Sequence, residues 1–243
     1  MHLDVLFLPC ELPARPRPER AAIVIDVIRA STTIVTAFQN GCRSILPVAD
    51  PAEAKAAKVA EPAAILAGER GGKRIPGFDL GNSPREFTRE AVAGRDVILC
   101  TSNGTKTLRA VGSGTAVAIG ALMNRGAVAD WLVARGEDCL IVCSGYEGIF
   151  SLEDAVCAGG IVERAVGRGG PLTLGDGARA CRLLWREYAA DLPRLLHEAG
   201  WGRRILAIGL GRDLDICAQL DVADVVPVMA GERIMADEPR AEA

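Results

Sequence analysis

The chain has 243 residues, of which 49% are hydrophobic and 24% are charged, and its formal net charge is −3 at pH 7. This composition excludes a mainly disordered chain, and the acidic balance argues against a general nucleic-acid binder, which needs a basic surface to displace counterions. No stretch reaches the ~20 apolar residues of a membrane span, and the N-terminus lacks the basic region of a signal peptide, so we expect a cytoplasmic protein without membrane contact.

Short apolar runs recur along the chain and predict β-strands. They are rich in Val, Ile and Leu and mostly lack polar alternation, which is typical of strands that are buried on both faces of a sheet. The predicted strands are 3–8, 22–25, 44–48, 64–67, 97–100, 115–118, 139–143, 205–209 and 225–229.

Amphipathic stretches between these runs predict helices. Asp50, Pro51 and Glu53 form a helix start, with an N-cap, a proline in the first turn and a glutamate at the third position. Ser83 and Pro84 repeat the pattern. Further helices are predicted over 124–135, 151–166, 177–190 and 192–199.

The alternation of strands and helices predicts an α/β fold with mostly parallel sheets flanked by helices. We place a domain boundary after residue 120, where one series of strands and helices ends, so that 1–120 and 121–243 form two α/β domains. The eight cysteines are scattered without a C-x-x-C pair, and the chain has only two histidines. This distribution argues against a zinc site and indicates reduced thiols in the core.

Unusual polar residues follow several predicted strands, at the strand ends where ligands bind in open α/β sheets. Asp26 and Arg29 follow strand 22–25, and the hydroxyl residues Ser31 and Thr32 come next. A carboxylate here suits a hard divalent cation, Arg binds phosphate oxygens with its planar fork, and a helix N-terminus holds an anion. The alternative is that Asp26 only caps a helix, and the residues favour neither interpretation.

Two further loops carry candidate ligands between residues 66 and 84. Glu69 lies in a glycine-rich charged loop, where it either ligates a metal or faces solvent in a turn. Asn82 and Ser83 follow in the next loop. Ser83 is a good helix N-cap, and the same helix start can also hold an anion.

A compact loop with Thr101, Asn103 and Gly104 connects a strand to a helix and resembles a phosphate cradle in composition. It lacks the G-x-x-x-x-G-K-[ST] spacing of a Walker A loop. It also lacks the arginine that a cysteine phosphatase would carry six positions after Cys100. We favour a functional loop over a plain turn.

The fourth loop begins with Ser144 and Gly145 and leads to a helix that opens with Glu153 and Asp154. No G-x-S-x-G elbow surrounds Ser144, which argues against a serine hydrolase. In the first turn of a helix, both acids would interact favourably with the helix dipole. Asp154 could also complete a capping box with Ser151. Adjacent helical residues point ~100° apart, so we expect one of the two acids to face the site.

Together the four loops supply at least three carboxylates, an arginine and several hydroxyl and glycine residues, without a conspicuous His or Cys nucleophile. Mg²⁺ takes carboxylate and water oxygens and neutralises phosphoryl charge. The combination therefore predicts a magnesium-assisted phosphate site.

Seven segments carry a family resemblance: DVIRASTTIVTA (26–37), GERGG (68–72), GFDLGNSPREF (77–87), TSNGTKTL (101–108), CSGYEGIFSLEDAVCAGGIVERA (143–165), GDGARAC (175–181) and, more weakly, DLDICAQLDVADVVPV (213–228). They resemble the 2-phosphosulfolactate phosphatase family, the magnesium-dependent phosphatases of coenzyme M biosynthesis. The resemblance implies two α/β domains with the active site in the cleft. It also implies hydrolysis of (R)-2-phospho-3-sulfolactate to sulfolactate and phosphate.

The resemblance places functional positions within these motifs, and their roles are our inference. We expect catalysis to depend on Asp26, Arg29 and Asn103. The expected Mg²⁺ ligands are Asp26, Glu69, Glu153 and Asp154. The expected ligands of the substrate and its phosphate are Ser31, Thr32, Asn82, Ser83, Thr101, Gly104, Ser144 and Gly145.

The attacking group is either water or Asp26, and we favour water because Asp26 lacks the D-x-D spacing of haloacid-dehalogenase-type phosphatases. The partner is a small anionic phosphorylated substrate, and a homo-oligomer is compatible with the sequence. Two alternatives stay open: a phosphatase of the same architecture that acts on another phosphoester, and a non-catalytic phospho-metabolite binding protein. Candidate partners for further anionic groups of the substrate are Arg70, Lys73, Arg85 and Lys106.

Overall fold

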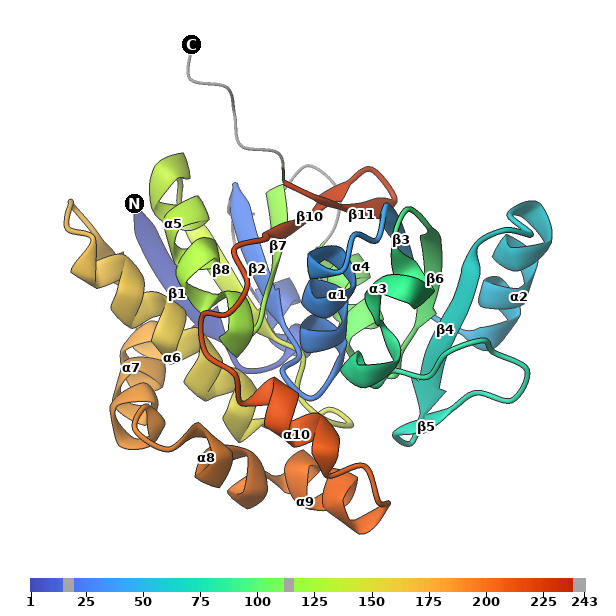
Figure 1. Cartoon of the computed structure of the whole chain (residues 1–243). Helices are drawn as coiled ribbons and strands as arrows, with labels where there is room; N and C mark the ends of the chain where they lie inside the picture. The colour runs from blue at the N-terminus through green and yellow to red at the C-terminus, as the bar shows by residue number, and fades with distance from the viewer. Residues whose placement is uncertain (15–19, 112–115, 238–243) are drawn as a thin grey trace.

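The computed structural model describes residues 1–14, 20–111 and 116–237 (Figure 1). Within these residues the strands form one sheet of eleven strands, in the order β5-β4-β6-β3-β11-β10-β7-β2-β8-β1-β9. The strands are β1 (His2–Leu6), β2 (Ala21–Ile25), β3 (Ser44–Val48), β4 (Ile65–Arg70), β5 (Lys73–Arg74), β6 (Asp96–Cys100), β7 (Ala116–Gly120), β8 (Cys139–Cys143), β9 (Thr173–Leu174), β10 (Pro227–Ala230) and β11 (Arg233–Ala236).

Ten α-helices and three short 3-10 helices connect the strands in the described part of the chain. The α-helices are α1 (Ala30–Gln39), α2 (Pro51–Ala60), α3 (Arg89–Val92), α4 (Gly104–Val111), α5 (Arg125–Arg135), α6 (Leu152–Gly167), α7 (Asp176–Tyr188), α8 (Leu192–Glu198), α9 (Gly200–Ala207) and α10 (Arg212–Cys217). The 3-10 helices are η1 (Pro9–Ala14), η2 (Pro84–Glu86) and η3 (Leu122–Asn124).

Most neighbouring strands are parallel, which confirms the predicted fold class. One parallel group is β7-β2-β8-β1-β9 and the other is β3-β6-β4. The antiparallel hairpin β10–β11 joins the two groups through one residue pair with β7 and one with β3. The division of the chain after residue 120 stays a prediction; β1 and β2 from the first half pair directly with β8 from the second.

The core lies on both faces of the sheet, as β2 illustrates. All five of its residues are buried. Ile23 and Ile25 belong to a hydrophobic cluster with α6, whereas Ala22 and Val24 belong to another cluster that includes Leu108 of α4. A strand covered on both faces needs apolar residues at every position, which explains its uninterrupted apolar run.

Eight of the nine predicted strands correspond to β1, β2, β3, β4, β6, β7, β8 and β10, within a few residues at each end. The predicted start of β7 at residue 115 lies outside the described residues. The strand predicted at 205–209 is wrong, because this apolar run is the end of α9 and the turn after it. Short apolar runs fit a strand or a buried helix equally well, and here Trp201 and Ile205 form the buried side of a helix. The strands β5, β9 and β11 were not predicted.

The predicted helix starts have mixed outcomes. The side chain of Asp50 accepts hydrogen bonds from the backbone N–H groups of Ala52 and Glu53, as an N-cap should. Ser83 precedes only the single turn η2 and makes no capping hydrogen bond, so its prediction as an ordinary N-cap is wrong. Ser151 also makes none at the start of α6, which contradicts the predicted capping box with Asp154.

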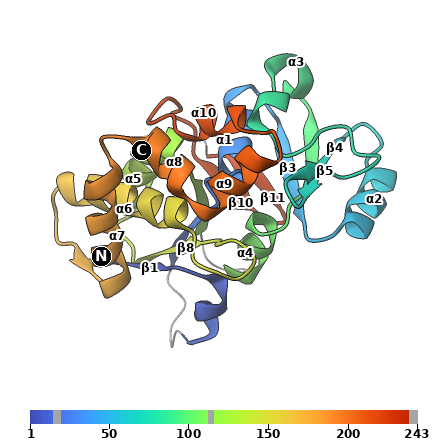
Figure 2. The same ribbon diagram turned by 90° about the horizontal axis from the view of Figure 1, so that it is seen from below.

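The helices α8, α9 and α10 lie beneath the sheet in Figure 1, and in the view from below they lie in front of it (Figure 2). The chain runs downward in β1 and β2 in Figure 1, so these helices cover the end of the sheet at which those strands finish. Among the described helices, none combines the length and the apolar character that crossing a bilayer requires.

Candidate active site

The loops predicted to carry chemistry meet around Asp26, the residue that directly follows β2. Asp26 is 8% exposed. Its backbone N–H donates to Ser31 Oγ at 2.9 Å, and its Oδ1 accepts from the backbone N–H of Ala30 at 3.3 Å. Burial, together with the nearby negative charges of Glu69 and Glu153, raises its pKa to about 7, although hydrogen bonds from backbone N–H groups partly oppose the rise. Asp26 thus contacts a helix start and also belongs to an acidic cluster, so the two interpretations of this residue are compatible.

Asp154, at the start of α6, connects two of these loops. Its Oδ1 accepts from the backbone N–H of Val27 at 2.8 Å, and its Oδ2 accepts from that of Gly145 at 3.2 Å. Burial raises the pKa of Asp154 well above its usual value, and the negative charges of Glu153 and Asp26 add to this. Both oxygens of Asp154 therefore hold backbone in place, across the loops that follow β2 and β8.

Glu153, the neighbour of Asp154, is 2% exposed, and its Oε2 has no hydrogen-bond partner. Burial raises the pKa of this carboxyl group, since the charged form loses its hydration. Among the described residues, two more buried side-chain atoms lack partners, Asn82 Oδ1 and Ser144 Oγ, and both residues belong to the predicted phosphate ligands. Buried polar atoms are nearly always hydrogen-bonded, so an orphaned group in a native structure points to a ligand, an ion or water.

Glu69, in β4, connects two other loops through both of its oxygens. Its Oε2 accepts from the backbone N–H of Gly72 at 2.8 Å, and its Oε1 accepts from that of Ser102 at 2.8 Å. The turn between β4 and β5 is thereby tied to the loop after β6. Glu69 is buried and lies close enough to Asp26 to raise its pKa.

The loop after β6 brings the N-terminus of α4 directly against Asp26. A Cβ on Gly104 would lie 2.8 Å from Ala30 Cβ and 3.0 Å from Asp26 Oδ2, so only glycine fits here. Thr101 Oγ1 accepts from the backbone N–H of Thr105 at 3.2 Å. The first turns of α1 and α4 therefore both face the Asp26 carboxylate, and helix N-termini favour negative charge.

The hydroxyls of Ser31 and Thr32 are used within the loop itself. Ser31 Oγ accepts from Asp26, and Thr32 Oγ1 donates to the carbonyl of Val27 at 2.8 Å. The side chain of Asn103 is half-buried at the start of α4. Gly145 has a φ of +65°, and a Cβ there would lie 2.6 Å from the carbonyl oxygen of Ile149, so this turn requires glycine.

Arg29 is buried and makes an ion pair with Asp213, a residue that no sequence motif singled out. Its Nη1 donates to Asp213 Oδ2 at 2.6 Å, and its Nη2 donates to the carbonyl of Gly72 at 2.6 Å. Ser83 Oγ donates to Asp213 Oδ1 at 2.6 Å. Asp213 lies in the weakly matching segment 213–228, but an acid in the first turn of a helix is ordinary, so its position carried no distinct signal.

The donor set around Asp26 consists of oxygen atoms, as a magnesium site requires. In the described residues no three His, Cys, Asp or Glu side chains form a ready-made metal group. Mg²⁺ usually binds through one or two carboxylates together with water and substrate phosphate, so this geometry does not exclude it. The unpartnered Oε2 of Glu153, beside Asp26, fits such a partial site.

A surface cavity of about 510 Å³ lies elsewhere, against α5. Three of its lining side chains already have charged partners, since Asp130 pairs with Arg168 and Arg135 pairs with Glu137. The cluster around Asp26 instead combines buried acids with unpartnered polar atoms, and we take it as the candidate active site.

Comparison with known proteins identifies the family of the chain. The family model described as 2-phosphosulpholactate phosphatase matches residues 6–232. The chain belongs to this family. The resemblance predicted from its sequence motifs is therefore confirmed.

Curated relatives support the 2-phosphosulpholactate phosphatase family over nearly the full chain. A protein of Symbiobacterium thermophilum is 38% identical over 225 residues, which are 92% of this chain and 97% of the relative. One of Thermosynechococcus vestitus is 40% identical and covers 97% of this chain and 99% of its own. One of Clostridium acetobutylicum is 33% identical and covers 97% and 100%. All three are named probable 2-phosphosulfolactate phosphatase.

Proposed function

We propose that this chain hydrolyses the phosphate monoester of 2-phosphosulfolactate, with Mg²⁺ as the cofactor and with Asp26 at the centre of the site. The observation that carries the proposal is the pair of buried carboxylates Asp26 and Glu153, one with an unpartnered oxygen, beside two helix N-termini in a chain of this family. Buried acids alone would repel a phosphate. A divalent cation between them and the substrate removes that conflict.

Of the four carboxylates predicted as metal ligands, Asp26 and Glu153 are the two that we propose for Mg²⁺. Glu69 and Asp154 have both oxygens occupied by backbone N–H groups, so we assign them to holding the loops in place. When bound, Mg²⁺ would neutralise phosphoryl charge and polarise the phosphorus centre. In the metal-free protein, protonation of Asp26 would remove part of the negative charge of the cluster, because burial raises the pKa of Asp26 to about 7.

The phosphoryl group needs donors as well as a cation, and the loops supply them. We propose that the backbone N–H groups at the start of α4 and the side chains of Ser144 and Asn82 bind phosphoryl oxygens. The hydroxyl of Ser144 can donate, and the amide of Asn82 carries two N–H groups. Arg29 adds positive charge next to this cradle, with its guanidinium fixed by Asp213 and by the carbonyl of Gly72.

Water remains our proposed attacking group, and Asn103 is our proposed residue for orienting it. Asn103 directly precedes α4 and is half-buried, so its side-chain amide lies at the helix start that we propose for the phosphate. The exposed cations Lys73, Arg85 and Lys106 are candidates for the sulfonate and carboxylate of the substrate. A cytoplasmic location is part of the proposal, as expected for a soluble metabolite substrate.

The test is phosphate release from 2-phosphosulfolactate and from a panel of other phosphate monoesters, with chelator-treated and Mg²⁺-loaded protein. The proposal expects the largest kcat/KM for 2-phosphosulfolactate and release only with Mg²⁺. Higher kcat/KM for another phosphoester would assign a different substrate to the same site. Binding of phosphate without release from any ester would show a non-catalytic binding protein.

A further inference from the structure

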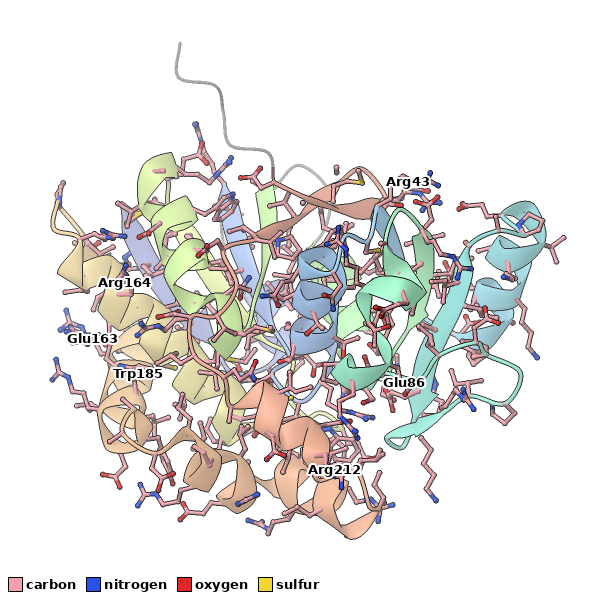
Figure 3. All side chains as sticks on the ribbon, in the orientation of Figure 1. Arg43, Glu86, Glu163, Arg164, Trp185 and Arg212 are labelled. Atoms are coloured by element: carbon pink, nitrogen blue, oxygen red, sulfur yellow. The ribbon has the colours of Figure 1, made fainter. Side chains whose placement is uncertain are left out.

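The helices α9 and α10 contact four separate loops of the candidate active site, those of Tyr146, Gly72, Arg29 and Ser83. Trp201 of α9 stacks on Tyr146, with 4.1 Å between the ring centroids. Gly72 packs so closely against α9 and the turn after it that a Cβ there would lie 2.7 Å from Ile208 Cδ1. Figure 3 labels Arg212 at the start of α10, and the next residue is Asp213.

Asp213 of α10 accepts hydrogen bonds from two residues that the sequence predicts in the site, Arg29 and Ser83. It is 1% exposed. Its two oxygens accept at 2.6 Å each, one from Arg29 Nη1 and the other from Ser83 Oγ. These donors come from different loops, one at the start of α1 and one before η2. A single carboxylate thus fixes the relative position of Arg29, which the proposed function places beside the phosphate, and of Ser83, which the sequence predicts as a phosphate ligand.

Hydrogen bonds at both terminal nitrogens of Arg29 restrict the orientation of its guanidinium group. Nη1 is held by Asp213, and Nη2 is held by the carbonyl of Gly72, which itself belongs to the turn secured by Glu69. A buried ion pair contributes little net stability compared with apolar side chains, because both charges lose hydration. Charge-assisted hydrogen bonds at both ends do, however, set a planar group in one orientation.

We propose that Asp213 is a positioning residue for phosphate binding, which acts by holding Arg29 and Ser83 in their binding orientation. This inference rests on the proposed function, since it takes both residues as part of the phosphate site. It makes α10, at the far end of the sequence from these loops, a required part of the active site.

Asp213→Asn keeps the shape of the side chain and removes its charge. Loss of a hydrogen bond to a charged group corresponds to roughly a 10- to 100-fold decrease in kcat/KM. We expect the inhibition constant of inorganic phosphate to rise about tenfold in parallel. The Mg²⁺ concentration that gives half-maximal activity should stay within about twofold, because Asp26 and Glu153 are not contacted by Asp213.

A double-mutant cycle separates positioning from a structural role. In an Arg29→Lys background the planar guanidinium is already lost. Adding Asp213→Asn should therefore lower kcat/KM by a clearly smaller factor than the same substitution does in the wild type. Asp221→Asn is the matched control, because Asp221 also pairs with an arginine, Arg125, and accepts from a backbone N–H, but its printed hydrogen bonds reach none of the residues assigned to the site. It should lower the melting temperature without changing kcat/KM.

Asp213→Glu, which keeps the charge but displaces the carboxylate by one methylene group, gives a second variant that tests positioning if Asp213→Asn does not fold. Wild-type kcat/KM with a lowered melting temperature in either folded variant would overturn the proposal, and so would full additivity with Arg29→Lys. Calorimetric binding of inorganic phosphate to the Mg²⁺-loaded protein gives an independent reading. If the wild type binds phosphate but hydrolyses no ester, the proposed function fails, while weaker phosphate binding by the Asp213 variants still supports the positioning role.

Discussion

Asp26→Asn should lower activity and at the same time stabilise the metal-free protein. The substitution keeps the shape of the side chain and removes a charge that the structure places next to two other carboxylates. If Asp26 binds Mg²⁺ or attacks phosphorus, turnover falls by at least ~10²-fold, which is roughly 3 kcal/mol in the activation barrier. A residue that only caps a helix would give wild-type turnover.

The stability effect follows from the pKa of Asp26. Burial raises this pKa from 3.8 to about 7, so the folded protein binds a proton more tightly than the unfolded chain does. Stability therefore falls as pH rises from about 4 to 7, by up to ~4 kcal/mol. Asn has no charge to desolvate, but its buried amide also lacks full hydrogen bonding. We expect a gain of about 2 kcal/mol at pH 8, or roughly 4–8 °C in Tm.

The assay compares melting temperatures of chelator-treated wild type and Asp26→Asn at pH 5 and pH 8, and turnover with Mg²⁺ on the same samples. Asp96→Asn is the matched control, for which we expect the opposite effect on stability at pH 8. Hydrogen bonding to Arg43 lowers the pKa of Asp96 to about 2, so its charge stabilises the fold above pH 4, and its loss should cost about 1 kcal/mol at pH 8 after solvent screening. An Asp26→Asn protein that is less stable than wild type at pH 8, or fully active, would refute the reasoning.

Three further predictions follow from the same geometry. Chelator-treated enzyme should be inactive and Mg²⁺ should restore it better than Ca²⁺, whose longer bonds suit looser sites, as phosphate release measures; full activity without metal contradicts the site. Cys100→Ala and Cys143→Ala should keep turnover within about tenfold, because burial raises the pKa of both thiols and keeps them protonated; a thousandfold loss in a folded variant would make a cysteine catalytic. Gly104→Ala should lower turnover about 10²-fold, since the new methyl group displaces Asp26. Gly167→Ala, with open space around it, is the control and should leave steady-state kinetics unchanged. Equal kinetics of the two variants would argue against close packing at Gly104.

The sequence determined the local structure wherever neighbouring residues supply the interactions. The apolar run of β2 has no polar position, so it had to be covered on both faces. Asp50 accepts hydrogen bonds from residues two and three positions later, which sequence spacing alone predicts. The ends of such strands carry the polar loops, and this is why the candidate residues of the acidic cluster could be named in advance.

Long-range contacts decided the rest, because a hydrogen-bond partner far along the chain leaves no trace in local spacing. Asp154 has the position for a capping box with Ser151, but its oxygens hold Val27 and Gly145 instead. The run at 205–209 became a helix end because Ile205 packs in the core beneath the sheet.

Ser83 shows most clearly what the local sequence determines and what the tertiary structure decides. As a serine before a proline it satisfies the local pattern of a helix N-cap. In the folded chain its hydroxyl turns to Asp213, 130 residues away, which also holds Arg29. Residue types at the strand ends determined which chemistry is available, whereas the folding of α10 onto the loops decided which of these groups are held together.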